Sequence, residues 1–259
     1  MNRIENAFKN KPIFMPYFPL GYPGLETSID VIEALAKNGA DLIEVGLSFS
    51  DPLADGPVNQ HAMQIALEKG ITIKKSLAAV KELRKRGVDI PLILMGYYNP
   101  MLAYGLEKFV NDACDAGADG FIIPDLPAEE ANEFKDVASD MPLIPMLAPT
   151  SSPERMERIA RHAKGFIYLV SVTGITGERK SLAEGLSDLV AQVREHTSVP
   201  VCVGFGIGTP EQAKAVGKMA DGAIVGTACV RTIGGSQTPV ETAKEFAAVF
   251  RSALSELRK

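Results

Sequence analysis

Two carboxylates lie close together in the sequence, one inside a hydrophobic segment and one in the turn-rich segment after it. Glu44 interrupts the apolar residues of Asp41–Leu47, a segment typical of a buried strand. A carboxylate there has to be paired or functional, because an unpaired buried charge is costly. Asp55 follows eleven residues later in Asp51–Pro57, where prolines and a glycine restrict the backbone. The pair therefore predicts acid–base chemistry at the carboxyl end of this strand.

Each of these residues also has a purely structural interpretation. Glu44 alone could belong to an ion pair, and Asp55 alone could cap a turn. His61 lies shortly after the acidic loop, but it has no nearby cysteine or second histidine with which to build a metal site. The pairing of Glu44 with Asp55, rather than either residue alone, favours a catalytic site.

The composition is that of an ordinary globular chain. Of 259 residues, 46% are hydrophobic and 23% are charged, and the formal net charge is -5. This acidic balance gives no general attraction to nucleic acid or anionic lipid. Cys114, Cys202 and Cys229 have the spacing of neither a disulfide framework nor a metal site. Because the sequence shows no secretory leader pattern or membrane-length apolar segment, we expect a cytoplasmic protein.

Short β-rich segments alternate with longer amphipathic segments along the chain, which implies a parallel sheet covered by helices. The predicted strands are Ile13–Phe18, Asp41–Leu47, Pro91–Gly96, Gly120–Pro124, Pro142–Leu147, Phe166–Ser171, Val199–Gly204 and Gly222–Gly226. The predicted helices are Glu26–Lys37, Ile73–Arg86, Leu106–Ala116, Ala128–Ser139, Pro153–His162, Leu186–Glu195, Pro210–Lys218 and Pro239–Leu257, with an extra helix at the amino terminus.

Three helix-to-strand junctions have nearly the same sequence. They are Asn38–Asp41, Ala116–Gly120 and Met219–Gly222. In the first two, a glycine can adopt the left-handed conformation that ends a helix. This repeat favours a closed barrel of like units, and no linker divides the chain. We therefore predict an α/β protein with one domain over residues 1–259, a single (β/α)8 TIM barrel, with an open doubly wound sheet as the alternative.

Glycine-rich turns follow the last three predicted strands. These turns are Thr173–Gly177, Val203–Pro210 and Val225–Ala228. Barrels often hold phosphate after strands seven and eight, where backbone amides and helix amino termini can bind an anion. A dinucleotide fingerprint is disfavoured, because the turn after strand seven lacks the third glycine at the required spacing. The turns therefore predict a phosphate site that needs no cationic side chain.

Further motifs lie along the whole chain. They are Leu42-Ile43-Glu44-Val45-Gly46, Phe49-Ser50-Asp51-Pro52-Leu53-Ala54-Asp55-Gly56-Pro57, Leu94-Met95, Tyr98-Asn99-Pro100, Ile123-Pro124-Asp125-Leu126-Pro127, Tyr168-Leu169-Val170-Ser171, Thr176-Gly177, Gly204-Phe205-Gly206-Ile207 and Ile224-Val225-Gly226-Thr227. Through these motifs the chain resembles the tryptophan synthase alpha subunit family over essentially its full length.

The resemblance implies a lyase of tryptophan biosynthesis that cleaves indole-3-glycerol phosphate to indole and glyceraldehyde 3-phosphate by a retro-aldol reaction. It implies no cofactor or metal on this chain. It also implies a partner, a beta subunit that carries pyridoxal phosphate and receives indole, in an alpha-beta-beta-alpha assembly.

The resemblance assigns roles to individual residues as well. Glu44 matches the general acid/base of the family, and Asp55 matches the carboxylate that holds the indole N–H. The residues expected around the substrate's indole and the mobile loop are Tyr17, Phe18, Leu94, Ile123, Tyr168 and Thr176. Those expected at the phosphate are Gly177, Gly206, Gly226 and Thr227.

Four positions depart from the family pattern. Ser48 stands where proline is usual, Asn59 where an aliphatic residue is usual, Tyr17 where phenylalanine is commoner, and Thr227 where serine is expected. The departures at Ser48 and Asn59 could alter loop rigidity and the partner contact. Two alternatives stay open: a stand-alone indole-glycerol-phosphate lyase, and a non-catalytic subunit that only activates a partner.

Overall fold

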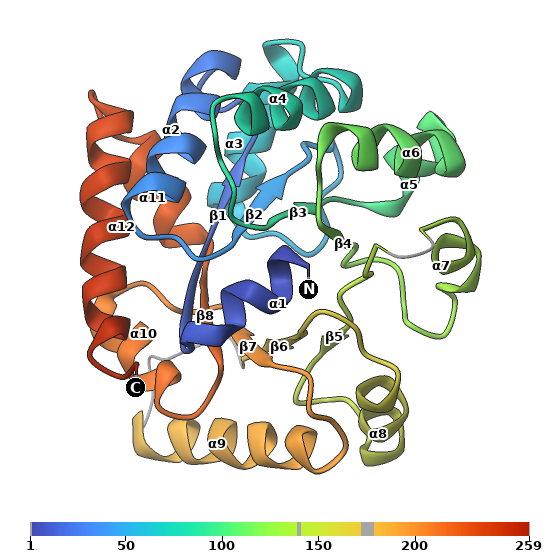
Figure 1. Cartoon of the computed structure of the whole chain (residues 1–259), viewed down its shortest axis with the longest axis vertical. Helices are drawn as coiled ribbons and strands as arrows, with labels where there is room; N and C mark the ends of the chain where they lie inside the picture. The colour runs from blue at the N-terminus through green and yellow to red at the C-terminus, as the bar shows by residue number, and fades with distance from the viewer. Residues whose placement is uncertain (1, 139–140, 172–178, 259) are drawn as a thin grey trace.

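The computed structural model describes residues 2–138, 141–171 and 179–258. Within these residues, eight parallel strands form one curled sheet in the order β4-β3-β2-β1-β8-β7-β6-β5, ringed by helices (Figure 1). The strands are β1 (Ile13–Pro19), β2 (Ile43–Gly46), β3 (Leu92–Met95), β4 (Gly120–Ile122), β5 (Met146–Leu147), β6 (Ile167–Val170), β7 (Val201–Gly204) and β8 (Gly222–Val225). Each of them lies within, or overlaps, a predicted strand.

The barrel closes between β4 and the segment that leads into β5. Phe121 and Leu143 form an isolated parallel bridge, in which the Phe121 N–H donates to the Pro142 carbonyl at 2.9 Å. The first and last strands, β1 and β8, are paired directly. The predicted TIM barrel is therefore confirmed, and the open doubly wound sheet is wrong. β5 is shorter than predicted because Pro142 and Pro145 have no N–H for the ladder.

The helices lie outside the strands, except at the amino terminus. They are α1 (Arg3–Ala7), α2 (Leu25–Asn38), α3 (Pro57–Glu68), α4 (Ile73–Lys85), α5 (Tyr98–Tyr104), α6 (Leu106–Ala116), α7 (Asn132–Ala138), α8 (Pro153–Arg161), α9 (Arg179–Glu195), α10 (Pro210–Gly217), α11 (Thr227–Gly234) and α12 (Pro239–Ser255), with a 3₁₀ turn at Phe8–Asn10. The helices α3, α5 and α11 were not predicted.

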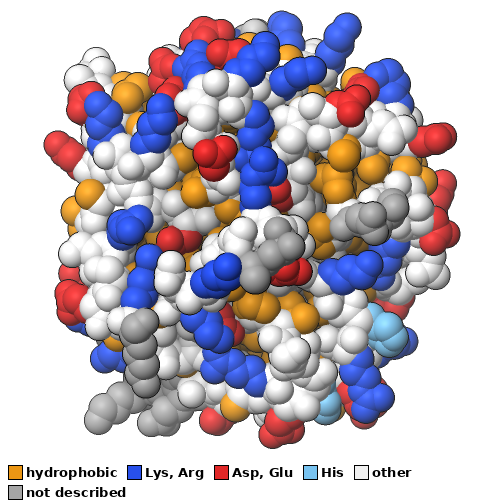
Figure 2. All heavy atoms as spheres, viewed as in Figure 1, with side chains coloured by type: hydrophobic (Ala, Val, Ile, Leu, Met, Phe, Trp, Pro, Cys, Tyr) orange, Lys and Arg blue, Asp and Glu red, His pale blue; other side chains and the backbone are white. Residues whose placement is uncertain are grey.

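The predicted extra amino-terminal helix is α1, which lies over the middle of the barrel (Figure 1). Phe8 follows it and packs on Phe166, at the start of β6, with ring centroids 5.9 Å apart. This end of the barrel is therefore covered, and the carboxyl ends of the strands open on the opposite side. On the covered face, lysine, arginine and acidic side chains intermingle (Figure 2).

The strand register decides which side chains enter the barrel. Tyr17 is paired with Glu44 in the register of β1 and β2. Residues in register share a face, and successive residues of a strand alternate between faces. Phe121, which has the opposite parity, packs on the rings of Phe109 and Phe134 from α6 and α7. That parity therefore faces the helices, and Tyr17 and Glu44 face the barrel interior. No helix in the described part of the chain is long and apolar enough to cross a membrane.

Candidate active site

Glu44 is the second residue of β2 and lies inside the barrel. The residue is 1% exposed, and its Oε1 is buried with no hydrogen-bond partner among the described residues. Burial, and to a lesser extent the charge of Asp55, raises the pKa of Glu44 well above its ordinary value. The protonated form of this carboxyl is therefore favoured, which gives the site a group able to donate a proton.

Asp55 has different surroundings, in the loop before α3. Its Oδ2 accepts a hydrogen bond from the Tyr97 hydroxyl at 2.7 Å, and its Oδ1 accepts one from Asn59 Nδ2 at 2.9 Å. The Ala54 N–H donates to the same Tyr97 oxygen at 3.0 Å, which fixes the loop to the end of β3. Asp55 also directly precedes Gly56, the residue at the amino end of α3, where the helix dipole suits a negative charge.

Two tyrosines share the interior with Glu44. Tyr17 and Tyr168 are both buried, and their hydroxyls lie over Gly46 and Gly204, where a Cβ would clash with the phenol. Glycine at these two positions therefore makes room for the rings. Burial raises the pKa of each phenol well above its ordinary value, and the charges of Asp55 and Glu44 add to this effect. Both hydroxyls are therefore neutral groups that can donate.

Three predicted substrate residues do not lie on this interior face. Phe18 and Leu94 have the helix-facing parity of their strands, and Ile123 lies beyond β4 against a cavity on the barrel flank. The structure therefore does not bring these three residues to the interior face, because a shift of one residue along a strand moves a side chain to the other face. The neighbouring residues that face the interior are Met95 on β3 and Ile122 on β4, which are paired in register.

The turns after β7 and β8 differ in what their backbone amides already bind. The N–H groups of Gly208 and Thr209 donate to Gln212 Oε1, at 2.7 and 3.1 Å, so the start of α10 is capped by its own side chain. The start of α11, at Gly226 and Thr227, has no side-chain cap among the described residues. Its first-turn amides can therefore receive an anion, and those of α10 are already bonded.

The turn after β7 has an unusual backbone. Phe205 and Gly206 both have positive φ, 69° and 75°, which is rare for phenylalanine. Ser171 Oγ donates to the Phe205 carbonyl at 2.6 Å, and the Tyr168 ring meets the Phe205 ring nearly edge-on at 6.1 Å. These contacts hold the Gly206 turn in place beside β6. The predicted residues at 176 and 177 lie outside the described residues.

Several residues that shape the site were absent from the predicted set. Tyr97 and Asn59 hold Asp55, and Ser171 supports the turn after β7. A signal for Tyr97 was available, because it directly follows a strand at the functional end of the barrel. Asn59 stood out only as a departure from the family pattern, and the helix that carries it was not predicted.

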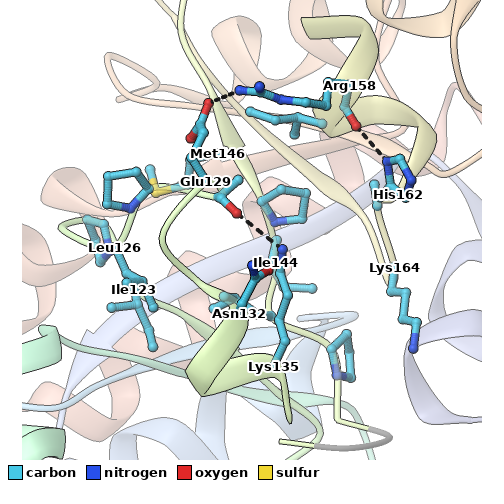
Figure 3. A pocket seen from close by; sticks show the side chains of 18 of the residues that line it. Ile123, Leu126, Glu129, Asn132, Lys135, Ile144, Met146, Arg158, His162 and Lys164 are labelled. Carbon is cyan, nitrogen blue, oxygen red and sulfur yellow. Dashed lines mark hydrogen bonds and ion pairs between the residues drawn. The ribbon is translucent and has the colours of Figure 1, made fainter. Parts of the chain in front are cut away.

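A separate cavity of about 760 Å³ lies on the flank of the barrel between α7 and α8 (Figure 3). At its mouth Glu129 accepts hydrogen bonds from Arg155 at 2.8 Å and Arg158 at 2.5 Å. Hydrogen bonding to Arg155 lowers the pKa of Glu129 to about 2. The lining residues fall between positions 123 and 164 and include neither Glu44 nor Asp55. Its paired charges link the loop before α7 to α8.

A family model described as tryptophan synthase alpha chain matches residues 4–257. The chain belongs to the tryptophan synthase alpha chain family. An alpha chain from Chloroflexus aggregans is 48% identical over 89% of this chain and 89% of its own length. One from Geobacillus kaustophilus is 45% identical over 96% of each chain. The solved alpha subunit from Legionella pneumophila has a TM-score of 0.88 and 36% identity, covering 98% of each chain.

Membership of the tryptophan synthase alpha chain family establishes the reaction. The chain is a carbon–carbon lyase of tryptophan biosynthesis that cleaves indole-3-glycerol phosphate and works with a beta subunit. The predicted family, fold and reaction are therefore confirmed.

Proposed function

We propose that Glu44 and Asp55 divide the retro-aldol chemistry between a proton carrier and a fixed negative charge. The contrast in their hydrogen bonding carries the proposal: Glu44 Oε1 is buried without a described partner, whereas both oxygens of Asp55 accept a hydrogen bond. Two carboxyls whose environments differ in this way are typical of sites that need an acid and an anion together.

In the proposed reaction, protonated Glu44 gives its proton to C3 of the indole ring. Asp55 accepts a hydrogen bond from the indole N–H and stabilises the positive charge that develops on the ring. The Glu44 carboxylate then takes the proton of the glycerol hydroxyl on the carbon bonded to C3. The carbon–carbon bond breaks, its electron pair returns to the ring, and the aldehyde of glyceraldehyde 3-phosphate forms. One proton has moved from oxygen to carbon, and Glu44 is protonated again.

The proposed substrate slot combines the interior residues with the uncapped helix start. Tyr17, Met95 and Ile122 supply apolar surface for a flat ring, and the Tyr168 hydroxyl lies over Gly204 in the same interior. The phosphate would bind at the amino end of α11, at Gly226 and Thr227, with the Gly206 turn alongside, and residues 176 and 177 stay predictions. The proposed reaction consists of proton transfers and the cleavage of one carbon–carbon bond without any change of redox partner, so we propose that the chain needs no cofactor of its own. In the part of the chain that the structure describes, no cluster of three or more metal-ligating side chains occurs.

The proposed contact with the beta subunit is the loop Asp51–Gly56. Leu53 is 87% exposed there, whereas the adjacent Pro52 is buried and fixes the backbone. The same loop carries Asp55, so a partner that binds Leu53 can influence the orientation of the carboxylate. We propose an alpha-beta-beta-alpha complex with pyridoxal phosphate on the beta subunit, formed in the cytoplasm by a chain that is one domain over residues 1–259.

Deuterium exchange at C3 of indole tests the proposed roles directly, because this exchange needs the proton transfer but not the carbon–carbon bond. Indole incubated with the chain in D₂O is followed by proton NMR. We expect exchange with the parent chain, none above background with Glu44→Gln, and slowed exchange with Asp55→Asn. Exchange at the parent rate in Glu44→Gln would remove Glu44 from the proton transfer. Adding beta subunit to the lyase assay separates a dependent subunit, whose rate rises, from a stand-alone lyase.

A further inference from the structure

An amide side chain lies on the buried face of α3. The buried residues of this helix are Asn59, Ala62, Met63 and Ala66, a spacing that forms one stripe against the barrel. Asn59 is 7% exposed, and the rest of the stripe is apolar. Because buried polar groups cost stability unless they are hydrogen-bonded, an amide at this position needs an explanation.

Asn59 makes one side-chain hydrogen bond and leaves its other polar atom unpaired. Nδ2 donates to Asp55 Oδ1 at 2.9 Å, whereas Oδ1 of the amide is buried with no partner among the residues the structure describes. A leucine at this position would avoid the unpaired oxygen but could not bind Asp55. The contact with the carboxylate is therefore the interaction that distinguishes asparagine from an apolar residue here.

Asn59 and Tyr97 together fix the plane of the Asp55 carboxylate. Asn59 on α3 donates to Oδ1 of Asp55, and Tyr97 after β3 donates to Oδ2 of the same carboxylate. Rotation of the carboxylate would therefore strain both hydrogen bonds. Each carboxylate oxygen can accept two hydrogen bonds. Both oxygens therefore keep the capacity to accept the indole N–H while the two donors stay in place.

We infer that Asn59 is a positioning residue, which holds Asp55 in the orientation that accepts the indole N–H before the substrate binds. This inference rests on the proposed function of Asp55 and adds to it a residue from α3. A polar group that is fixed in advance needs no reorganisation when charge develops in the transition state. Asn59 acts through Asp55, so its replacement should weaken the recognition of the indole N–H.

Two substitutions on α3 form the first test. Asn59→Leu should lower kcat/KM for indole-3-glycerol phosphate by roughly tenfold or more, the change expected when one hydrogen bond to a charged group is lost. It should also raise Tm, because the unpaired buried oxygen is removed. Gln64→Leu is the matched control: Gln64 is exposed on the same helix and its amide binds Glu68 at 2.9 Å. The control should leave kcat/KM unchanged. A purely structural Asn59 would instead give a lower Tm and an unchanged kcat/KM in Asn59→Leu, which would overturn the inference.

Binding of indole and of indene, measured by calorimetry, gives a second and more specific test. Indene has the shape of indole but no N–H, so the ratio of the two Kd values reports the contact with Asp55. We expect this ratio to shrink at least threefold in Asn59→Leu, which cannot donate to Asp55. An unchanged ratio in Asn59→Leu would overturn the inference. If Asp55→Ala, which has no acceptor for the indole N–H, also keeps the parent ratio, the proposed role of Asp55 fails; if only Asp55→Ala changes the ratio, the inference about Asn59 fails alone.

Discussion

Glu44 and Asp55 belong to the same barrel mouth, yet the structure treats them in opposite ways. Glu44 projects from a strand into the interior, and burial raises its pKa. Asp55 lies on a loop at a helix amino end, with a hydrogen bond to each of its oxygens. The comparison shows how the local environment can distinguish two similar side chains: burial favours the neutral form of Glu44, whereas two donors hold the Asp55 carboxylate in place.

The largest effect on activity is expected from Glu44→Gln, which keeps the shape of the side chain but removes its ability to transfer a proton. We expect kcat to fall by about 10²–10⁴-fold, the usual contribution of a general acid–base group. Binding of indole should persist, because Asp55 and its two donors are unchanged. Steady-state kinetics and calorimetry on one preparation measure both quantities. A rate within about tenfold of the parent would show that another group transfers the proton.

Asp55→Asn should have the next largest effect, because it removes the charge but keeps an oxygen that can accept the indole N–H. We expect kcat to fall by about 10²-fold, at the lower end of losses seen when one stabilising group is removed from a charged transition state. The KM should change less than kcat, since the charge matters most when the ring becomes cationic. An effect confined to KM would mean that Asp55 only binds the ground state.

The eight strands and the glycine turns after β7 and β8 could be predicted because both are local features of the sequence. Glu44 and Asp55 were found for the same reason, since an acid in an apolar segment and an acid in a proline-rich turn stand out. The sequence could not show which side of the sheet Leu94 and Ile123 face, because apolar and polar residues do not alternate in buried parallel strands. The resemblance to the family therefore placed these side chains one residue away from the interior positions.

The donors to Asp55 were missed for a different reason. Tyr97 is 42 residues from Asp55, so this hydrogen bond depends on the pairing of β2 with β3. Asn59 is near Asp55 in sequence, but the contact requires α3, whose buried stripe of two alanines, one methionine and one amide gives a weak helical pattern. Nonlocal pairing and an atypical helix face thus conceal the residues that position the carboxylate.

The buried state of Glu44 also predicts how stability depends on pH. Its pKa is raised in the folded chain, so folding favours the protonated form. This contribution is fully present below the ordinary glutamate pKa and is lost as pH rises through the folded pKa. Tm of the parent should therefore fall relative to that of Glu44→Gln as pH rises across this range, by a few degrees per about 1 kcal/mol. If the Tm of the two chains changes with pH in parallel, burial does not raise the pKa of Glu44.

The smallest effect is expected at Leu53, on the loop that carries Asp55 but with its side chain in solvent. Leu53→Ser removes apolar surface that is 87% exposed, so the isolated lyase rate should stay within about twofold of the parent, as for ordinary surface changes. Activation by a beta subunit should need several-fold more partner, because truncating an interface side chain typically costs about 1 kcal/mol or more. Titrating beta subunit against the lyase rate measures both values. The exposed Leu102, outside the loop Asp51–Gly56, provides the matched control, Leu102→Ser. Equal weakening by both substitutions would show that the partner does not select this loop, and a changed isolated rate in Leu53→Ser alone would show that the loop acts on Asp55 without a partner.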